Sequence, residues 1–573
     1  MRYKLIGAND PSQLITTVLH NRGIADPEAY LSIKNSSDVA WENLDNINAA
    51  VDLFMEHFEK QHKMAILVDP DVDGVCSATI IYKYIKCLDV DYPLQIVVHD
   101  KNKCHGLEDW DYQLDEDVKL FIIPDAASND ITQHIELQKQ GIDIICLDHH
   151  KVNRDITLSP AIVVNNQISA DYINHDCCGA SVTLEFCRAL DVATWNDYAP
   201  QFYDLAAVAN VADDVSLKAL ETRGIIVEGT TSVKNKMLQA IIKAQQFSMK
   251  GVISPFTISF YVAPLINAFL RLATKEEREL LMEGFIENET QTFLYTKRNK
   301  DVVEENIYEH LARLMQSYKG KQDRARDKAL KQLFPIADTQ CNNKVIIIDA
   351  TDILDQAFTG LVAIRLSEYI GRPVLLVRKM ESEDKYGGSG RAFDNCPITD
   401  FRALTEKCPY VSLAQGHNSA FGVHINDINA AISWFNEELK DVDMAKKYLV
   451  DFDVNSNDVW MRWCIDVEQY KTIFGHGVSA PLWLVRNVVI EGDNAKIIGK
   501  SSDTVQFYNN ETGVQFVKFK CDEDDKLLNA IRNNWEKTDF KLNIIGSLNV
   551  NTYNDEAIPQ VIIVDYEFIE END

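Results

Sequence analysis

Three aspartates alternate along the stretch LVDPDVDGV, residues 67–75, as Asp69, Asp71 and Asp73. Carboxylates this close repel one another strongly unless a cation neutralises them. The stretch is therefore either a solvated turn or part of a metal site. An EF-hand calcium loop would need an acidic residue at position 80, where this chain has Ile80. A solvated turn and a metal site of another kind are the interpretations that remain.

The flanks of this triplet predict its place in a fold. MAILV before it is typical of a β-strand, and ATIIYKYI after it is typical of a helix. Open α/β sheets bind their ligands at the carboxyl ends of parallel strands. This order of elements therefore puts the three aspartates where such a sheet places its ligands.

Acids and histidines follow further apolar runs, which we interpret as strand ends of the same sheet: Asp125 after LFIIP, Asp148, His149 and His150 after IDIICL, and Asp213 and Asp214 after LAAVANVA. A single aspartate at a strand end is most often a turn or helix cap. Several such groups at successive strand ends are hard to explain as caps. Carboxylates with an imidazole suit about two Mn²⁺ or Mg²⁺ ions, which activate water and neutralise a phosphoryl group during in-line displacement.

The elements that must position these groups predict an α/β fold with several domains. Short apolar runs alternate with helical patterns from about residue 64 to 225, which indicates a parallel, doubly wound sheet: MAILV, LQIVV, VKLFII, IDIICL and AIVV. KVIIID and PVLLV belong to a second α/β unit, and the tail resembles a small all-β barrel. The predicted boundaries are 1–60 for an N-terminal helical segment, 61–228 for the first α/β domain, 229–335 for a helical connector, 336–446 for the second α/β domain and 447–573 for the β-domain.

Composition limits the classes of function. The 12 cysteines are scattered without a CxxC pair, which indicates reduced thiols in a cytoplasm. We find no run of about 18 apolar residues and no apolar N-terminal segment, so we expect neither a membrane span nor a secretory signal. The net charge of −30 disfavours nucleic acid as a partner unless positive charge is concentrated in a groove. Lysines and arginines around residues 271–300 could supply that charge. Four aromatic residues of the tail could stack on bases, but we expect most of them in the barrel core: Trp483, Phe507, Tyr508 and Phe516.

Four of these stretches resemble the ordered motifs of the DHH phosphoesterase superfamily: DPDVDG, the lone Asp125, LDHH and NVADDV. The resemblance implies catalytic roles for His149, His150 and Asp148. Asp148 would hold an imidazole tautomer, and His150 would contact the scissile phosphate or polarise the nucleophile. Asp214 lies where the superfamily usually has a small or apolar residue and is left out. The implied metal ligands are Asp69, Asp71, Asp73, Asp125, His149 and Asp213.

The second α/β unit contains two stretches that resemble the paired motifs of the DHHA1 domain: YGGSGRAF, residues 386–393, and AQGHNSAFGVHI, residues 414–425. We expect a glycine-rich turn in the first, whose backbone N–H groups, hydroxyl and guanidinium would clamp a 5′-phosphate. The implied phosphate- and DNA-binding residues of the two motifs are Gly388, Ser389, Gly390, Arg391, Gly416 and His417.

Three further stretches resemble the RecJ family of single-strand-specific exonucleases: LHNRGIADPEAYLS, the connector APLINAFLRL and IFGHGVSAPLWLVRNVVI. In the connector, the resemblance implies that Asn267 and Arg271 bind DNA. The third stretch is similar to the opening of the family's OB-fold. The resemblance covers nearly the whole chain. Leu265 and Leu270 replace an Arg and a Gly of the connector motif. A family loop with Arg and an aromatic residue is only loosely matched, and its candidate substitutes are Lys101, Lys103, His105 and Gly106.

The resemblance implies a 5′-to-3′ exonuclease that releases 5′-mononucleotides from single-stranded DNA in repair, recombination or replication. It implies two Mn²⁺ ions, with Mg²⁺ as the alternative. The expected partners are a 5′ end of single-stranded DNA, a single-strand-binding protein and a helicase, with no membrane. We expect a monomer in the cytoplasm of a bacterium or a phage-infected host. Two alternatives stay open. One is a nanoRNase or cyclic-dinucleotide phosphodiesterase of the same superfamily, whose members generally lack the long connector and the OB-like tail. The other is a non-catalytic replication scaffold, which would have lost metal ligands.

Overall fold

The apolar runs of the first domain form a parallel sheet in the order β3-β2-β4-β5-β6. The strands are β2 (Lys63–Val68), β3 (Leu94–Val98), β4 (Val118–Pro124), β5 (Asp143–Asp148) and β6 (Ile162–Asn165). Alternate residues of β2 enter two different cores, since Ile66 packs with the helices of one face and Leu67 with those of the other. The chain order reverses between β2 and β4, and such a reversal opens a crevice for ligands. The doubly wound α/β prediction is confirmed.

Helices cover both faces of this sheet. One face carries α3 (Ile47–Glu59), α4 (Val72–Leu88) and α6 (Gly179–Thr194), and the other carries α5 (Ile131–Lys139). The structure, a computed structural model, describes residues 1–34, 40–100, 105–107, 112–297, 300–380, 385–491, 494–499, 501–534, 540–553 and 556–569.

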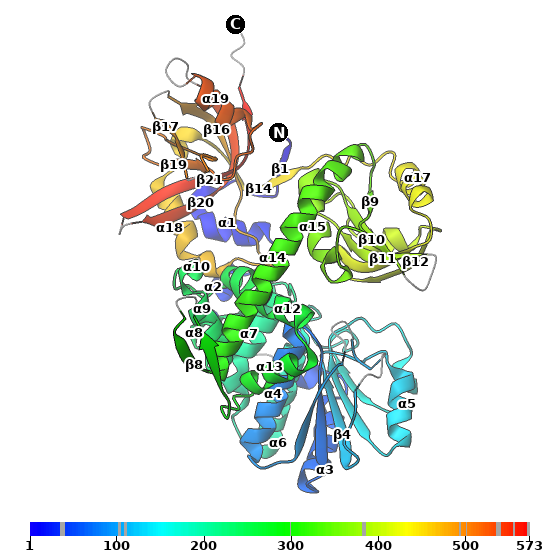
Figure 1. Cartoon of the computed structure of the whole chain (residues 1–573). Helices are drawn as coiled ribbons and strands as arrows, with labels where there is room; N and C mark the ends of the chain where they lie inside the picture. The colour runs from blue at the N-terminus through cyan, green and yellow to red at the C-terminus, as the bar shows by residue number, and fades with distance from the viewer. Residues whose placement is uncertain are drawn as a thin grey trace.

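The connector is mostly helical and ends in one long helix, α14 (Ile307–Thr339), which runs from the first domain to the second α/β domain (Figure 1). Helices α7 (Tyr203–Ala212) and α8 (Leu220–Thr231) close the first domain. The connector then contains α9 (Lys236–Ala244), α10 (Gln246–Met249), α11 (Pro255–Thr257), the π-helical turn η5 (Ile258–Val262), α12 (Ala263–Leu272) and α13 (Lys275–Phe285) before α14.

One stretch of the connector, Pro255–Leu272, is long and apolar enough to cross a membrane, whereas the sequence analysis expected no such stretch. However, 56% of it is buried inside the structure. Its α12 portion packs against α14 and α7, and Leu265 and Leu270 lie in the core. Packing in the protein interior therefore accounts for most of its apolar side chains, while Phe256 and Phe260 are exposed.

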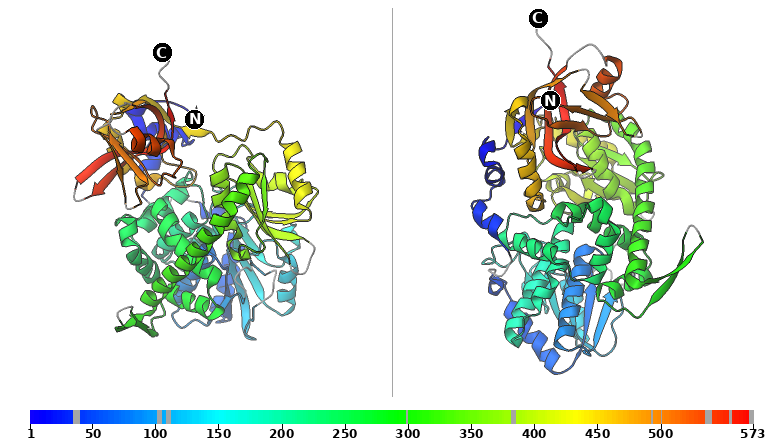
Figure 2. Two further views of the ribbon diagram at one scale, coloured as in Figure 1. Left: turned by 45° about the horizontal axis from the view of Figure 1, so that its top comes forward. Right: turned by 90° about the vertical axis from the view of Figure 1, so that its left-hand side faces the viewer.

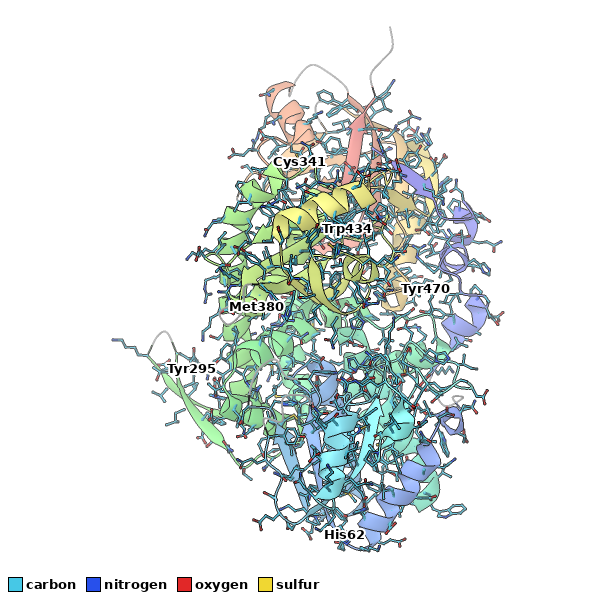
Figure 3. All side chains as sticks on the ribbon, turned by 90° about the vertical axis from the view of Figure 1, so that its right-hand side faces the viewer. His62, Tyr295, Cys341, Met380, Trp434 and Tyr470 are labelled. Atoms are coloured by element: carbon cyan, nitrogen blue, oxygen red, sulfur yellow. The ribbon has the colours of Figure 1, made fainter. Side chains whose placement is uncertain are left out.

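A β-hairpin interrupts the connector, which the sequence analysis expected to be helical throughout. Strands β7 (Thr292–Thr296) and β8 (Val302–Asn306) pair in antiparallel fashion and project from the body, as Figures 2 and 3 show, with Tyr295 labelled in Figure 3. The aromatic and β-branched runs TFLYT and VV favour strands, which explains the difference. Lys297 and Lys300 lie in the connection between these two strands.

The second α/β domain has a mixed sheet in the order β12-β13-β11-β10-β9, in which only β9 and β10 are parallel among the described pairs. Its strands are β9 (Ile346–Asp349), β10 (Val374–Lys379), β11 (Tyr386–Arg391), β12 (Val411–Gly416) and β13 (Ala420–Ile425), and its helices are α15 (Thr359–Ile370), α16 (Phe401–Glu406) and α17 (Ile428–Glu438). The glycine-rich stretch YGGSGR is therefore strand β11 rather than the expected turn.

The C-terminal domain is a β-structure in the strand order β15-β16-β20-β21-β19-β18-β17. Its strands are β15 (Phe452–Asn455), β16 (Trp483–Ile490), β17 (Ala495–Ile498), β18 (Thr504–Tyr508), β19 (Gln515–Lys518), β20 (Phe540–Tyr553) and β21 (Glu556–Phe568), with helices α18 (Met461–Gln469) and α19 (Lys526–Asn534). Trp483, Phe507 and Phe516 are fully buried, as expected for core residues, while Tyr508 is half-buried.

Residues 1–60, which we treated as one helical segment, divide between two parts of the molecule. Strand β1 (Tyr3–Leu5) pairs with β14 (Tyr448–Val450) of the C-terminal domain, and α1 (Leu14–Asn21) packs on α18. After α2 (Pro27–Ser32), helix α3 joins the first sheet. The start of the chain therefore ties the C-terminal domain to the first domain (Figure 2).

Candidate metal centre

The three aspartates after β2 occupy the start of helix α4. Asp71 is its N-cap and accepts a hydrogen bond from the N–H of Gly74 at 2.9 Å. Asp73 lies in the first turn, and its two carboxylate oxygens accept from the N–H groups of Gly179 at 2.7 Å and Ala180 at 2.8 Å. Two helix N-termini therefore fix the triplet, and their positive ends favour its negative charge.

Asp69 is held by the loop that follows β3. The N–H of Gly106 donates to its Oδ1 at 3.0 Å, and Nδ1 of His105 lies 3.1 Å from its Oδ2. His105 and Gly106 were candidate substitutes for a family loop, and both contact this buried carboxylate, while the His105 ring also lies 4.5 Å from that of His150. Lys101 and Lys103, the other candidates in this loop, lie outside the described residues.

Asp125 follows β4 in the left-handed backbone region, with φ of 65°. Its Oδ1 is buried, and no described residue donates a hydrogen bond to it, although Nε2 of His149 lies 3.1 Å away. Burial and the charges of Asp73 and Asp71 raise the pKa of Asp125 well above its usual value. The ionised form of this buried carboxylate would be stabilised by a cation next to it.

The Asp-His-His sequence after β5 divides its two imidazoles between two tasks. Nε2 of His149 lies 3.1 Å from Asp125, 3.7 Å from Asp73 and 3.8 Å from Asp213. Burial lowers the pKa of His149 to about 4, so the ring is neutral at physiological pH and has a lone pair for a metal.

His150 is oriented by Asp148 instead. Its Nδ1 lies 2.8 Å from Oδ1 of Asp148, which also accepts from the backbone N–H groups of His149 and His150. Burial opposes ionisation of Asp148, but the charge and hydrogen bond of His150 outweigh it and hold the pKa of Asp148 well below its usual value. The second nitrogen of His150 is thereby left for another partner, and 36% of its side chain is exposed.

Asp213 comes from the end of helix α7, not from a strand end as the sequence analysis expected. The run LAAVANVA is rich in alanine, which favours a helix. Burial and the charges of Asp73 and Asp71 raise the pKa of Asp213 to about 9. Asp214, which the sequence analysis left out, has φ of 52° and is exposed beside it.

These side chains meet in three groups, in each of which one ligand atom per residue lies within 4.8 Å of the others. The groups are Asp73, His149 and Asp213; Asp69, Asp71 and Asp125; and Asp125, His149 and His150. The first two groups lie next to each other, since His149 contacts Asp125. Their carboxylate and imidazole donors suit divalent Mn or Mg, and the unsatisfied Asp125 oxygen fits such an ion.

A second, cationic group lies across from the acids. Ser389 and Arg391 share one face of β11, and Arg271 of α12 is close enough for its charge to act on Arg391. Burial and Arg271 lower the pKa of Arg391 to about 10. Arg271 in turn is close enough to feel Asp71, so the cations and the acids belong to one region. Asn267 lies one turn before Arg271 on α12 and is half-buried.

The glycines of β11 have a packing role. The strand pairs with β10 and β13 on both sides, so its backbone N–H groups serve the sheet and do not form the expected phosphate nest. A Cβ at Gly388 would lie 2.1 Å from the carbonyl oxygen of Leu376, and one at Gly390 would lie 2.4 Å from the ring of Phe421. Gly416 has φ of 132° at the end of β12.

His417, in the turn after β12, faces the first domain. Its charge is felt by His149, and it is itself influenced by His150, Lys151 and Arg391. The structure therefore places His417 near the acid and histidine groups. Sequence reasoning missed the N–H groups of α6 that hold Asp73; a Gly-Ala-Ser start to an apolar helical run was the available signal.

Two family models and several known proteins match the chain. Residues 63–209 match the DHH family, N-terminal domain, and residues 450–565 match the RecJ OB domain. YorK, a putative SPbeta prophage-derived single-strand DNA-specific exonuclease of Bacillus subtilis, is 33% identical across 99% of this chain and 98% of that protein. The single-stranded-DNA-specific exonuclease RecJ of Bacillus subtilis is 22% identical across 96% of this chain and 67% of that protein.

Solved structures share the fold. The crystal structure of RecJ in complex with Mn²⁺ from Thermus thermophilus aligns with a TM-score of 0.73 at 20% identity, covering 99% of this chain and 80% of that one. The Mg²⁺ complex from the same organism gives a TM-score of 0.70 at 19% identity, covering 99% of this chain and 79% of that one.

Proposed function

Because the chain belongs to the RecJ family of single-strand-DNA-specific exonucleases, we propose that it is a metal-dependent exonuclease that removes 5′-mononucleotides from the 5′ end of single-stranded DNA. The proposal includes two divalent ions, Mn²⁺ or Mg²⁺. Their ligands would be Asp73, His149 and Asp213 for one ion and Asp69, Asp71 and Asp125 for the other.

One observation carries the proposal: two arginines lie together next to the acidic groups. Arg271 feels both Arg391 and Asp71. Guanidinium groups present forked donors, and a phosphate is the anion that suits them. A terminal 5′-phosphate held there would bring the adjoining phosphodiester toward the acids, which gives both the exonuclease mode and the 5′-to-3′ direction.

The chain's own residues would then divide the work. Ser389, Arg391 and Arg271 bind the terminal phosphate, with Asn267, His417 and the glycines of β11 and β12 shaping the cleft. Bound divalent ions would supply activated water and neutralise charge on the phosphoryl group. His150, with Nδ1 fixed by Asp148, presents Nε2 to the scissile phosphate. His149 stays neutral and keeps its lone pair toward the ions.

The test is digestion of 5′-labelled and 3′-labelled single strands and duplexes with Mn²⁺, Mg²⁺ or chelator. We expect mononucleotides from the 5′ end of single strands only, and none with chelator. Release from the 3′ end, or digestion of duplex at equal rate, would contradict the proposal. A dinucleotide cleaved much faster than a long strand would favour the nanoRNase class instead. Intact strands under every condition would favour a scaffold.

The clamp is tested separately by Arg391→Ala. This variant should bind strands with a 5′-phosphate more weakly and lose its preference for them over 5′-hydroxyl strands. Equal rates of the wild-type protein on 5′-phosphate and 5′-hydroxyl strands would argue against the clamp but not against the nuclease activity.

We further propose that the enzyme acts as a monomer in DNA repair, recombination or replication inside a bacterium or phage-infected host. A single-strand-binding protein and a helicase are its proposed partners.

A further inference from the structure

Helix α15 begins directly beneath the two clamp residues of β11. Ser389 and Arg391 are two positions apart on the strand, so their side chains point to the same face, and α15 packs on β11. The Thr359 hydroxyl lies 2.9 Å from the Ser389 hydroxyl. Arg391 also donates from Nη1 to the carbonyl of Gly390 at 2.7 Å. The first turn of α15 therefore forms the floor under both functional groups.

Gly360 is the residue of α15 that contacts the guanidinium. A Cβ at this position would lie 2.5 Å from Nη2 of Arg391, 3.1 Å from its Cζ and 3.4 Å from Oγ of Ser389. An alanine would therefore push the guanidinium out of its present place. The space that glycine leaves at 360 is occupied by the head of Arg391.

Backbone geometry gives no other reason for this glycine. Gly360 is not among the positive-φ residues of the described chain, and alanine is favoured over glycine in helix interiors by about 1 kcal/mol. The helix would therefore accept alanine, whereas Arg391 would not. A packing role toward bulk core does not explain the contact either, because the nearest atoms belong to a charged group.

The electrostatics of this arrangement suit an anion. Arg391 lies at the N-terminal end of α15, where the helix dipole is positive, and Arg271 adds a second positive charge beside it. Burial and that neighbour together lower the pKa of Arg391 to about 10. Such a cation would move toward solvent if the residues around it did not fix its position.

We infer that Gly360 and Thr359 are positioning residues, which set the places of Arg391 and Ser389 and thereby determine the preference for a 5′-phosphorylated end. This inference rests on the proposed function. Gly360 gives the guanidinium its place by leaving room for it, and Thr359 orients the serine hydroxyl through their contact. Neither residue would touch the reacting atoms.

The experiment compares Gly360→Ala with the wild-type protein on two strands of one sequence, one with a 5′-phosphate and one with a 5′-hydroxyl. Loss of one charge-assisted contact predicts about a tenfold fall or more in the ratio of kcat/KM for the two strands. The increase should be in KM for the phosphorylated strand, while hydrolysis of the hydroxyl strand stays within about threefold. Anisotropy in chelator should show the same loss of preference in binding alone.

Gly320→Ala in α14 is the matched control. Its Cβ would meet only the end of the flexible Arg324 side chain, at 3.3 Å, so the end preference should not change. Thr359→Val should reduce the preference, and Thr359→Ser should restore it, because serine keeps the hydroxyl. If a thermal melt shows that Gly360→Ala does not fold, the comparison of Thr359→Val with Thr359→Ser tests the inference instead.

The outcomes separate the inference from the proposed function. A wild-type protein without single-strand exonuclease activity would overturn the proposed function. An active wild-type protein that prefers 5′-phosphate, together with a folded Gly360→Ala variant of unchanged preference, would overturn the role of Gly360 alone. Thr359→Val with unchanged preference would overturn the role of Thr359 alone.

Discussion

His149 and Asp73 are both candidate ligands, but the fold depends on them to different degrees. Nε2 of His149 faces three carboxylates, whereas Asp73 also accepts the first N–H groups of α6. We therefore expect His149→Ala to lose Mn²⁺-dependent cleavage by about 1,000-fold or more, since metal catalysis supplies several kcal/mol, with an unchanged melting temperature. Asp73→Ala should lose cleavage and also have a lower melting temperature. The reason is that the N–H groups of Gly179 and Ala180 would be left without their acceptor, and unsatisfied buried donors cost about 1–3 kcal/mol each.

The measurements are nucleotide release, Mn²⁺ binding by calorimetry and thermal melts of both variants. Full activity of His149→Ala would remove this residue from the site. A melting temperature of Asp73→Ala equal to that of the wild-type protein would contradict its role in holding α6.

The acids also predict how metal removal changes stability with pH. Asp213 has a folded-state pKa of about 9 against 3.8 for an exposed aspartate, because of burial and the charges of Asp73 and Asp71. Between these values the folded state holds a proton that the unfolded state releases, so the contribution of Asp213 to stability falls as pH rises. Burial lowers the pKa of His149 from 6.5 to about 4, so its contribution rises with pH only up to about 6.5.

Above pH 6.5 the Asp213 effect is therefore no longer offset by His149. In chelator, the melting temperature should fall from about pH 6.5 to about pH 8.5, and it should fall less for Asp213→Asn. Mn²⁺ should raise the melting temperature more at the higher pH, because it replaces the proton as the neutralising charge. The same slope in the wild-type protein and in Asp213→Asn would contradict this assignment.

Single elements decided where the sequence analysis succeeded and where it did not. The five parallel strands were predictable, because each is a short apolar run that is followed by polar residues. Strand β11 was not, since three glycines in YGGSGR suggest a turn. Its pairing on both sides with β10 and β13 outweighs that local preference. The same holds for α7, whose apolar run alone does not distinguish a helix from a buried strand.

The glycines of β11 give a prediction about packing. At Gly388 a Cβ would meet the backbone oxygen of Leu376 at 2.1 Å, which cannot move without breaking the sheet. We expect Gly388→Ala to destabilise the second α/β domain by about 1–3 kcal/mol. Gly422→Ala on neighbouring β13 is the control, since its nearest atom is 3.7 Å away. Denaturant unfolding and hydrogen exchange of β10 would measure the difference, and equal stability of the two variants would refute it.

For the whole molecule, apolar runs predicted a set of domains and candidate ligands, and only the family resemblance, not periodicity, predicted which distant residues act together. Most of these candidates follow an apolar strand of the same sheet, whereas Asp213 follows helix α7. The proximity of Arg271 to Arg391 depends on how α12 and β11 are placed by the long helix α14, and no local pattern encodes that. The pairing of β1 with β14 likewise joins residues more than 400 positions apart, which periodicity does not show.

The last prediction concerns this link between the ends of the chain. Arg22 donates two hydrogen bonds to Asp451, at 2.7 and 2.9 Å, and both side chains are buried, with 8% and 0% exposed. Arg22→Ala would leave a buried carboxylate unpaired, which costs about 3–5 kcal/mol. We expect faster hydrogen exchange in β1 and β14 and earlier unfolding of the C-terminal domain in urea.

Arg2→Ala offers the control from the same segment. Its partner Asp443 is on the surface, with side chains 60% and 54% exposed, so its loss should cost no more than about 1 kcal/mol. A double variant, Arg22→Met with Asp451→Leu, should recover part of the stability, because a well-packed apolar pair can replace a buried ion pair. If Arg22→Ala and Arg2→Ala unfolded alike, the buried pair would not be what attaches the N-terminal segment to the C-terminal domain.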